Sequence, residues 1–265
     1  MKIGVFGNCQ TDGMAASIKS LTGHDVFEYT VQKARTATDE ELKDIANQLG
    51  QCDAIFTQPA ISQPFAPVSF DALKALCANT IAFPHIATTT LHPDCHYVRD
   101  NGVSQVGPMG PYHSAIIAAC YLMGIPQKRV PLLFNKFVYS SLGYLAVPTQ
   151  YQPMYNDAQI MEYDFSEFVS GARGAFMHTP NHPNADIIFS TAQQALSKAK
   201  IAFSNSEIPE DRLEPLGVWP VYPEIADPFS FEGSIVFKQR KSLGNIYSLE
   251  EVIEEFYKSY DAVNP

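Results

Sequence analysis

The chain has 265 residues, of which 46% are hydrophobic and 17% are charged. This composition argues against a disordered protein, and the length allows a substantial buried core. The net charge of −10 at pH 7 argues against non-specific nucleic-acid binding, because such binding relies on clustered lysine and arginine. No apolar run approaches the roughly 18 residues of a membrane-spanning helix, so no span is predicted.

The amino terminus lacks the hydrophobic region of a signal peptide, which makes a cytoplasmic location the expectation. The cysteines are odd in number, widely spaced and without a CxxC pair. This pattern is typical of reduced thiols rather than of a disulfide framework or a zinc knuckle. The five are Cys9, Cys52, Cys77, Cys95 and Cys120.

Strand-like and helix-like segments alternate over residues 1–87. Strands separated by helices need crossover connections, which predict a parallel sheet. We expect strands at 2–6, 25–31, 53–59 and 80–84, and helices at 14–21, 39–50 and 69–77.

From about Thr88 the pattern changes to proline- and glycine-broken loops and helices. Asn184 is placed to cap one helix, and Ser248 with Glu251 forms the capping box of the last one. The chain therefore reads as a single α/β domain over 1–265, with a βα-alternating core at 1–87 and a helical part at 88–265. Helical segments are expected at 112–125, 126–135, 139–145, 158–174, 185–199 and 248–260.

The turn Gly7-Asn8-Cys9-Gln10 joins the first strand to the first helix, where open α/β proteins place ligands. A helix start lowers the pKa of a cysteine, and the backbone N–H groups of Asn8, Cys9 and Gln10 are candidates to stabilise an oxyanion. Cys9 is thus a candidate nucleophile. The alternative is a buried structural cysteine, the commonest fate of a free thiol.

Two polar loops offer partners for this cysteine. The motif "LHPDC" follows the fourth strand and holds His92 and Asp94, and "HTPNHP" holds His178, Asn181 and His182. Because parallel strands end at one edge of the sheet, the first loop is expected to face the Cys9 turn. His92 or His182 is the candidate base, with an Asp or Asn orienting it. Alternatively, the Asp and Asn side chains only cap turns ahead of helices.

Other polar residues are candidates to bind a ligand. In "GPMGPYHSA", Tyr112 and His113 stand at a helix start that could meet a phosphate or a sugar, whereas Ser114 could be an ordinary N-cap. Gln58 ends the third predicted strand and could donate its amide to the same crevice. The basic candidates for an anionic ligand are Lys128 with Arg129, Arg173, and the run 238–241, although most such runs are solvated faces.

Metal and nucleotide motifs are weak or absent. Pro180 and Pro183 would break the helix needed to put His178 and His182 on one face, so the HExxH arrangement fails and no metal site is predicted. The chain has neither a GxGxxG nor a P-loop motif.

Four motifs in a fixed order resemble the WcbI family of capsular polysaccharide biosynthesis enzymes. They are "GNCQ", "FP" followed by "LHPD", "GPYHSAII" and "HTPNHP". The resemblance covers about residues 2–200 and implies a coenzyme A-binding protein, proposed to be an acetyltransferase acting on a bacterial surface sugar. It also implies an SGNH-like turn, and hence an α/β fold with a parallel Rossmann- or SGNH-like sheet followed by a mostly helical half.

These inferences predict acyl transfer from acetyl-coenzyme A to a hydroxyl of a sugar or glycan, with Cys9, His92, Asp94 and His182 as the catalytic set. The runner-up is an SGNH-like esterase or deacetylase, and a non-catalytic sugar- or nucleotide-binding module stays open. The sequence leaves the acceptor, the base and the oligomeric state open. The residues expected to bind coenzyme A are Asn8, Gln10, Gln58, Tyr112, His113, Ser114, Arg173, His178 and Asn181.

Overall fold

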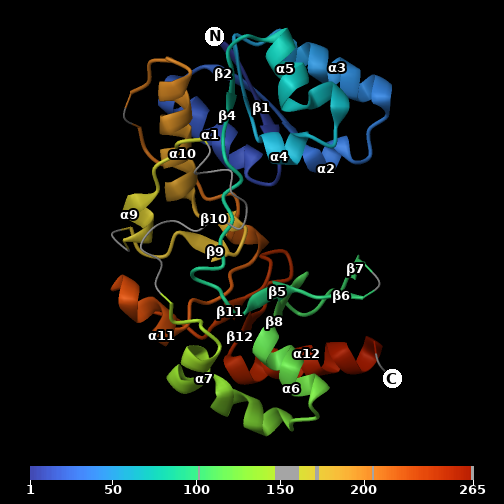
Figure 1. Cartoon of the computed structure of the whole chain (residues 1–265), viewed down its shortest axis with the longest axis vertical. Helices are drawn as coiled ribbons and strands as arrows, with labels where there is room; N and C mark the ends of the chain where they lie inside the picture. Colours follow the sequence, from blue (N-terminus) through green and yellow to red (C-terminus); the bar gives the residue numbers. More distant parts are fainter. Residues whose placement is uncertain (101, 147–160, 171–172, 205, 264–265) are drawn as a thin grey trace. The chain divides into compact units, whose positions relative to one another are not determined.

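The structure is a computed structural model that describes residues 1–100, 102–146, 161–170, 173–204 and 206–263 (Figure 1). The chain forms two compact units. Unit 1 comprises residues 1–87, 153–164 and 182–213, and unit 2 comprises residues 88–152, 165–181 and 214–265. That the two units form a single domain stays a prediction.

Unit 1 contains a parallel four-stranded sheet, as the alternation of strands and helices predicted. Its strands lie in the order β2-β1-β3-β4. The central strand β1 pairs on both sides and is an unbroken apolar run, which is typical of a strand covered on both faces. The strands are β1 (Lys2–Gly7), β2 (Asp25–Thr30), β3 (Ala54–Thr57) and β4 (Thr80–Ala82).

The helices of unit 1 largely match the predicted segments. The first helix begins three residues earlier than expected, directly after the Cys9 turn, and Asn184 caps α10 through the backbone N–H of Ile187. A capping box at Thr38 starts α3. The elements are α1 (Thr11–Thr22), α2 (Val31–Ala34), α3 (Asp39–Gly50), α4 (Pro59–Ser62), η1 (Ala66–Val68), α5 (Phe70–Leu76), β10 (His182–Pro183) and α10 (Ala185–Lys198).

Unit 2 combines helices with short strands that the sequence did not predict. The antiparallel pairs are β5 (Cys95–Tyr97) with β8 (Tyr112–Ser114), β6 (Arg99–Asp100) with β7 (Val103–Ser104), and β11 (Phe237–Lys238) with β12 (Ile246–Tyr247). The other elements are α6 (Ala115–Leu122), η2 (Gln127–Leu133), α7 (Lys136–Ser141), α9 (Ser166–Val169), β9 (Met177–Thr179), η3 (Glu214–Leu216), α11 (Pro223–Ala226), η4 (Asp227–Phe229) and α12 (Leu249–Val263).

Three helix predictions in unit 2 need correction. Residues 112–114 are a strand, because they pair with β5 before α6 begins. Residues 127–133 form a 3-10 helix containing Pro131, which lacks the N–H that an α-helix needs. Of the helix predicted at 158–174, the described residues form only α9, while 158–160 and 171–172 lie outside the described residues.

Aromatic rings make up much of the core of unit 2. Tyr139 stacks on Tyr222 with ring centroids 5.5 Å apart, and Trp219 meets Phe237 edge to face at 5.0 Å. Trp219 and Tyr222 come from the segment "VWPVYP", so this tail segment completes the core. In the part of the chain that the structure describes, no helix is long and apolar enough to cross a membrane.

Candidate functional site

The turn after β1 is held by side chains rather than left open for a ligand. The backbone N–H of Asn8 donates to Oε1 of Gln58 at 2.9 Å, and the N–H of Gln10 donates to Oδ1 of Asn8 at 2.9 Å. Both amides were predicted to stabilise an oxyanion. Each of these two N–H groups donates to a buried acceptor within the protein, and their contact with an oxyanion stays a prediction.

Two buried glutamines connect this turn to the ends of the neighbouring strands. The side chain of Gln10 exchanges two hydrogen bonds with the backbone of Ile86, at 2.7 and 3.1 Å. Nε2 of Gln58 donates to Oε1 of Gln10 at 3.2 Å and to the carbonyl of Pro84 at 3.3 Å. The network joins the ends of β1, β3 and β4, so both glutamines position the turn. Their contact with coenzyme A stays a prediction.

The environment of Cys9 raises the pKa of its thiol instead of lowering it. Burial raises this pKa to about 11, and a hydrogen bond with the backbone of the same residue opposes the rise only partly. The predicted lowering by the helix start is therefore wrong, because loss of water outweighs the field of the helix. Cys9 is nevertheless the only cysteine that is partly exposed; the other four are buried.

The helices α1 and α10 pack against each other in unit 1. A Cβ atom on Gly13, in the first turn of α1, would lie 3.1 Å from Cδ1 of Ile188 in the first turn of α10. Beyond the other end, the N–H of Ser204 donates to the carbonyl of Leu21 at 3.1 Å. The helices thus start together, α1 two residues after Cys9 and α10 three residues after His182. That His182 lines the same crevice as Cys9 stays a prediction.

His92 lies in unit 2, where it is fully buried. Its Nε2 is 3.0 Å from the carbonyl oxygen of Trp219. A carbonyl only accepts, so Nε2 carries the proton and Nδ1 keeps its lone pair, with no partner among the described residues. Burial, and to a smaller extent the nearby His178, lowers the pKa of His92 to about 3. The ring is therefore neutral at neutral pH.

Asp94 is buried beside the start of α6. Its Oδ1 accepts from the backbone N–H of Ile116 at 2.9 Å, and its Oδ2 accepts from the hydroxyl of Tyr222 at 2.8 Å. Burial raises the pKa of this carboxyl to about 6, although these bonds and one from Ser114 oppose the rise. In the described part of the chain no hydrogen bond joins Asp94 to His92, and the carboxylate serves the helix start instead.

Tyr112 and Asn181 bond to each other in unit 2. The hydroxyl of Tyr112 donates to Oδ1 of Asn181 at 2.6 Å, and the hydroxyl of Thr179 lies 3.2 Å from both. The backbone carbonyl of His178 accepts from the N–H of Trp219 at 2.8 Å. The motif "HTPN" is thus tied to the start of β8 and to the aromatic tail.

His113 and Ser114 also have partners within unit 2. The ring of His113 has Nδ1 3.0 Å from the hydroxyl of Tyr260 and Nε2 3.2 Å from the carbonyl of Gln105. Ser114 caps α6 by accepting from the N–H of Ile117 at 3.1 Å, the ordinary N-cap that was the alternative for this residue. Binding of coenzyme A by these residues stays a prediction.

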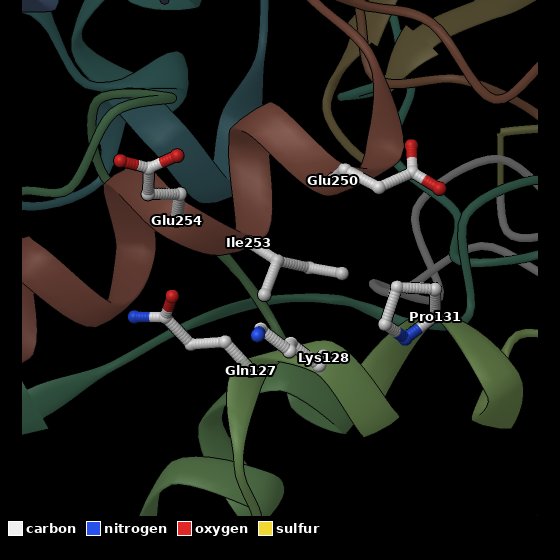
Figure 2. Close-up of a pocket in the computed structure, with 6 residues that line it drawn as sticks. All are labelled: Gln127, Lys128, Pro131, Glu250, Ile253 and Glu254. Atoms are coloured by element: carbon white, nitrogen blue, oxygen red, sulfur yellow. The ribbon is translucent and has the colours of Figure 1, made fainter.

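The basic candidates face carboxylates. Arg173 pairs with Glu167 at 3.1 Å on the surface. Lys128 lines a pocket of about 420 Å³ between η2 and α12 together with Glu250 and Glu254 (Figure 2). Contact of Lys128, Arg129 or Arg173 with the phosphates of coenzyme A stays a prediction.

Four residues of the two units were missed from the sequence. Thr11 and Thr57 have buried hydroxyls without a hydrogen-bond partner among the described residues, and both stand beside the Cys9 turn, at the start of α1 and the end of β3. Trp219 and Tyr222 hold His92 and Asp94. The only signal for the second pair was the aromatic motif "VWPVYP".

The predicted site residues fall into two groups. Cys9 belongs to unit 1 and His92 to unit 2, so their pairing stays a prediction. Among the described residues no cluster of three or more His, Cys, Asp or Glu could hold a metal ion. Unit 1 holds Asn8, Cys9, Gln10, Gln58 and His182, and unit 2 holds His92, Asp94, Tyr112, His113, Ser114, Arg173, His178 and Asn181.

Comparisons with known proteins agree with the sequence motifs. Residues 2–204 match the family described as polysaccharide biosynthesis enzyme WcbI. The chain also resembles a solved structure of WcbI, described as a novel polysaccharide biosynthesis enzyme in a native form without a disulfide bond between coenzyme A and a cysteine of that protein. The identity is 16%, the TM-score is 0.74, and the alignment covers 98% of this chain and 90% of that chain, which shows a shared fold. No curated protein matches the chain. The chain belongs to the WcbI family of polysaccharide biosynthesis enzymes.

Proposed function

We propose that this protein is a cytoplasmic acyltransferase that moves an acyl group, acetyl in the simplest case, from coenzyme A to a sugar hydroxyl during synthesis of a surface polysaccharide. Membership of the WcbI family supports a role in polysaccharide biosynthesis. The related solved protein is described as a native form without a disulfide bond between coenzyme A and one of its cysteines, so coenzyme A and a cysteine are named together for that protein, which supports coenzyme A as the ligand. The observation that carries the proposal is that Cys9 alone among the five cysteines is partly exposed.

The raised pKa of Cys9 favours one of its two candidate roles. A thiol with a pKa of about 11 stays protonated at neutral pH, which disfavours attack on an acyl group. We therefore assign Cys9 to holding the acyl thioester rather than to forming one. Bound acetyl-coenzyme A would supply an acyl group already activated as a thioester. The buried hydroxyl of Thr11, two residues further on, is a second group suited to this end of the ligand.

The acceptor hydroxyl must lose its proton as its oxygen attacks the acyl carbon. His92 offers an unprotonated Nδ1, because its Nε2–H is engaged by the Trp219 carbonyl. Its low pKa makes it a weak base until a hydroxyl bonds to it. His182 is the other candidate, since it lies at the same helix end as Cys9 in unit 1. The choice between them is left to experiment.

A thiol trap tests the binding of coenzyme A at Cys9. The symmetrical disulfide of coenzyme A is added to the protein, so that a nearby protein thiol displaces one coenzyme A as its thiol and forms a mixed disulfide with the other. We expect one adduct in wild type at pH 8, none in Cys9→Ser, and an unchanged adduct in the control Cys120→Ser. Labelling spread over several cysteines, or none in wild type, would contradict the assignment.

Thermal unfolding with coenzyme A separates binding from chemistry. A ligand that binds only the folded state raises the melting temperature. A shift together with thiol release from acetyl-coenzyme A that depends on a sugar acceptor supports a transferase. Acyl release to water alone supports the esterase alternative, and a shift without turnover supports a binding module. If millimolar coenzyme A produces no shift, the proposed ligand is wrong.

A further inference from the structure

The charge of the chain is unevenly distributed. Residues 101–156 contain no aspartate or glutamate, although the chain has 28 acidic residues and a net charge of −10. Three basic residues, Lys128, Arg129 and Lys136, lie within this stretch, and all three are exposed. In the described part of the chain none of them forms an ion pair. The stretch is thus a local positive region on an acidic protein.

Large apolar side chains are exposed around these basic residues. We call residues 122–142, from the end of α6 through η2 and α7, the docking segment. A contiguous exposed apolar patch marks an interaction surface, and the exposed apolar side chains below all come from this one stretch of the chain. The exposed fractions are 81% for Leu122, 75% for Met123, 74% for Leu132, 80% for Phe137 and 51% for Leu142.

The docking segment is a fixed part of unit 2. Val130 in η2 and Tyr139 in α7 are buried and hold their elements against the core. The hydroxyl of Tyr257 in α12 donates to the carbonyl of Ile125 at 2.7 Å, and Asn135 caps α7. Helix α12 packs against α6 and η2 within unit 2. The exposure of the apolar side chains is therefore a property of the folded segment.

We propose that the docking segment binds the surface of a bilayer that contains anionic lipids. Exposed leucine, methionine and phenylalanine can enter the boundary between headgroups and acyl chains, while neighbouring lysine and arginine pair with lipid phosphates. No carboxylate within the segment opposes this contact. Glu250 and Glu254 line the same pocket as Lys128 (Figure 2). Lys258 pairs with both Glu254 and Glu255 at 2.8 Å, so it offsets part of the negative charge of α12.

A second copy of the chain fits this surface less well than a lipid does. In a two-fold symmetric dimer the same patch meets itself. Lys128, Arg129 and Lys136 would then face their own copies, and like charges brought together at an interface oppose association. An anionic bilayer complements both the charge and the apolar side chains, and such a contact is peripheral and needs no spanning helix.

Co-sedimentation with vesicles tests the proposal. We expect wild type to bind vesicles of phosphatidylcholine with phosphatidylglycerol, and to bind pure phosphatidylcholine at least about tenfold more weakly. Added salt is expected to weaken the binding. The triple variant Lys128→Glu, Arg129→Glu, Lys136→Glu should lose about 100-fold in partitioning, since each basic residue contributes roughly fivefold. Equal binding to both vesicle types would overturn the proposal.

Two matched controls exclude general effects of charge and polarity. The variant Lys19→Glu, Lys33→Glu, Lys43→Glu carries the same charge change on unit 1 and is expected to bind like wild type. Leu132→Ser with Phe137→Ser should weaken binding, whereas Val103→Ser with Val106→Ser should not.

Light scattering after gel filtration tests whether a second copy of the chain, rather than a lipid surface, binds the docking segment. Wild type that is dimeric without lipid and becomes monomeric in the Leu132→Ser, Phe137→Ser variant would show that the segment binds a second copy instead. Unchanged melting temperatures in all the variants confirm that a loss of binding is not a loss of folding. The test is independent of acyl transfer, because it measures lipid binding alone.

Discussion

The side-chain oxygen of Gln58 accepts a hydrogen bond from the backbone N–H of Asn8 at 2.9 Å. The two residues are fifty positions apart, and the bond joins the end of β3 to the turn that carries Cys9. Because the same amide also donates to Pro84, a single buried side chain fixes the path of the chain beside the candidate site. The first predictions concern this contact.

Replacing Gln58 by leucine should destabilise unit 1 and disturb the Cys9 turn. The change leaves the N–H of Asn8 buried without an acceptor, which costs about 1–3 kcal/mol in the free energy of unfolding. Gln58→Glu keeps the side-chain oxygen that accepts from the N–H of Asn8, but it removes the amide N–H that donates to Pro84. This variant therefore separates the contact with Asn8 from the contact with Pro84. Urea unfolding measures the loss. An unchanged midpoint for Gln58→Leu would show that the bond does not hold the turn.

Gly7→Ala should lower the free energy of unfolding more than Gly4→Ala in the same strand. A Cβ atom on Gly7 would lie 2.5 Å from Oε1 of Gln58, so it must displace the acceptor of the Asn8 N–H. A Cβ on Gly4 would lie 2.7 Å from a methyl group of Leu49, which can rotate away. We expect Gly7→Ala to cost about 2–3 kcal/mol by overpacking and the lost bond. Thermal unfolding of the two variants provides the comparison, and equal losses would contradict the prediction.

Alkylation of Cys9 should depend steeply on pH. With burial raising the pKa to about 11, the reactive thiolate is scarce at neutral pH. The rate with iodoacetamide should therefore rise about tenfold per pH unit from pH 7 to 10. Mass spectrometry of wild type against Cys9→Ser isolates this thiol. A rate that levels off below pH 8 would instead indicate a lowered pKa and restore the nucleophile role.

The stability contributed by Asp94 should decline as the pH rises. Burial raises its pKa from 3.8 to about 6, so the folded state favours the neutral carboxyl. The contribution is complete below about pH 3.8 and is lost as the pH passes 6, because the buried group must then ionise. Relative to Asp94→Asn, wild type should lose about 2.4 kcal/mol of unfolding free energy between pH 4 and pH 7.

Urea unfolding at several pH values measures this difference between wild type and Asp94→Asn. Asp71→Asn, on the exposed surface of α5, controls for effects of the substitution itself. If the free energies of unfolding of wild type and Asp94→Asn changed in parallel with pH, the carboxyl would have the same pKa in the folded and unfolded states. Its burial would then not govern its ionisation.

The short-range features of this protein follow from the sequence alone. The apolar run of β1, the cap at Asn184 and the capping box of Ser248 with Glu251 were predicted and are present. Each depends on residues within a few positions of one another, so local propensity and periodicity suffice to find it. The order of four motifs was also enough to identify the family.

The surroundings of the candidate site residues were decided only by tertiary structure. Asp94 was expected to orient a histidine, but its carboxylate accepts from Tyr222, which is 128 residues away. The pKa of Cys9 was expected to fall, yet burial raises it. Sequence reveals the chemical type of a residue and its neighbours along the chain. How far a thiol is shielded from water, and which groups donate hydrogen bonds to a carboxylate, depend on segments that lie far apart in the sequence. Only folding brings these segments together.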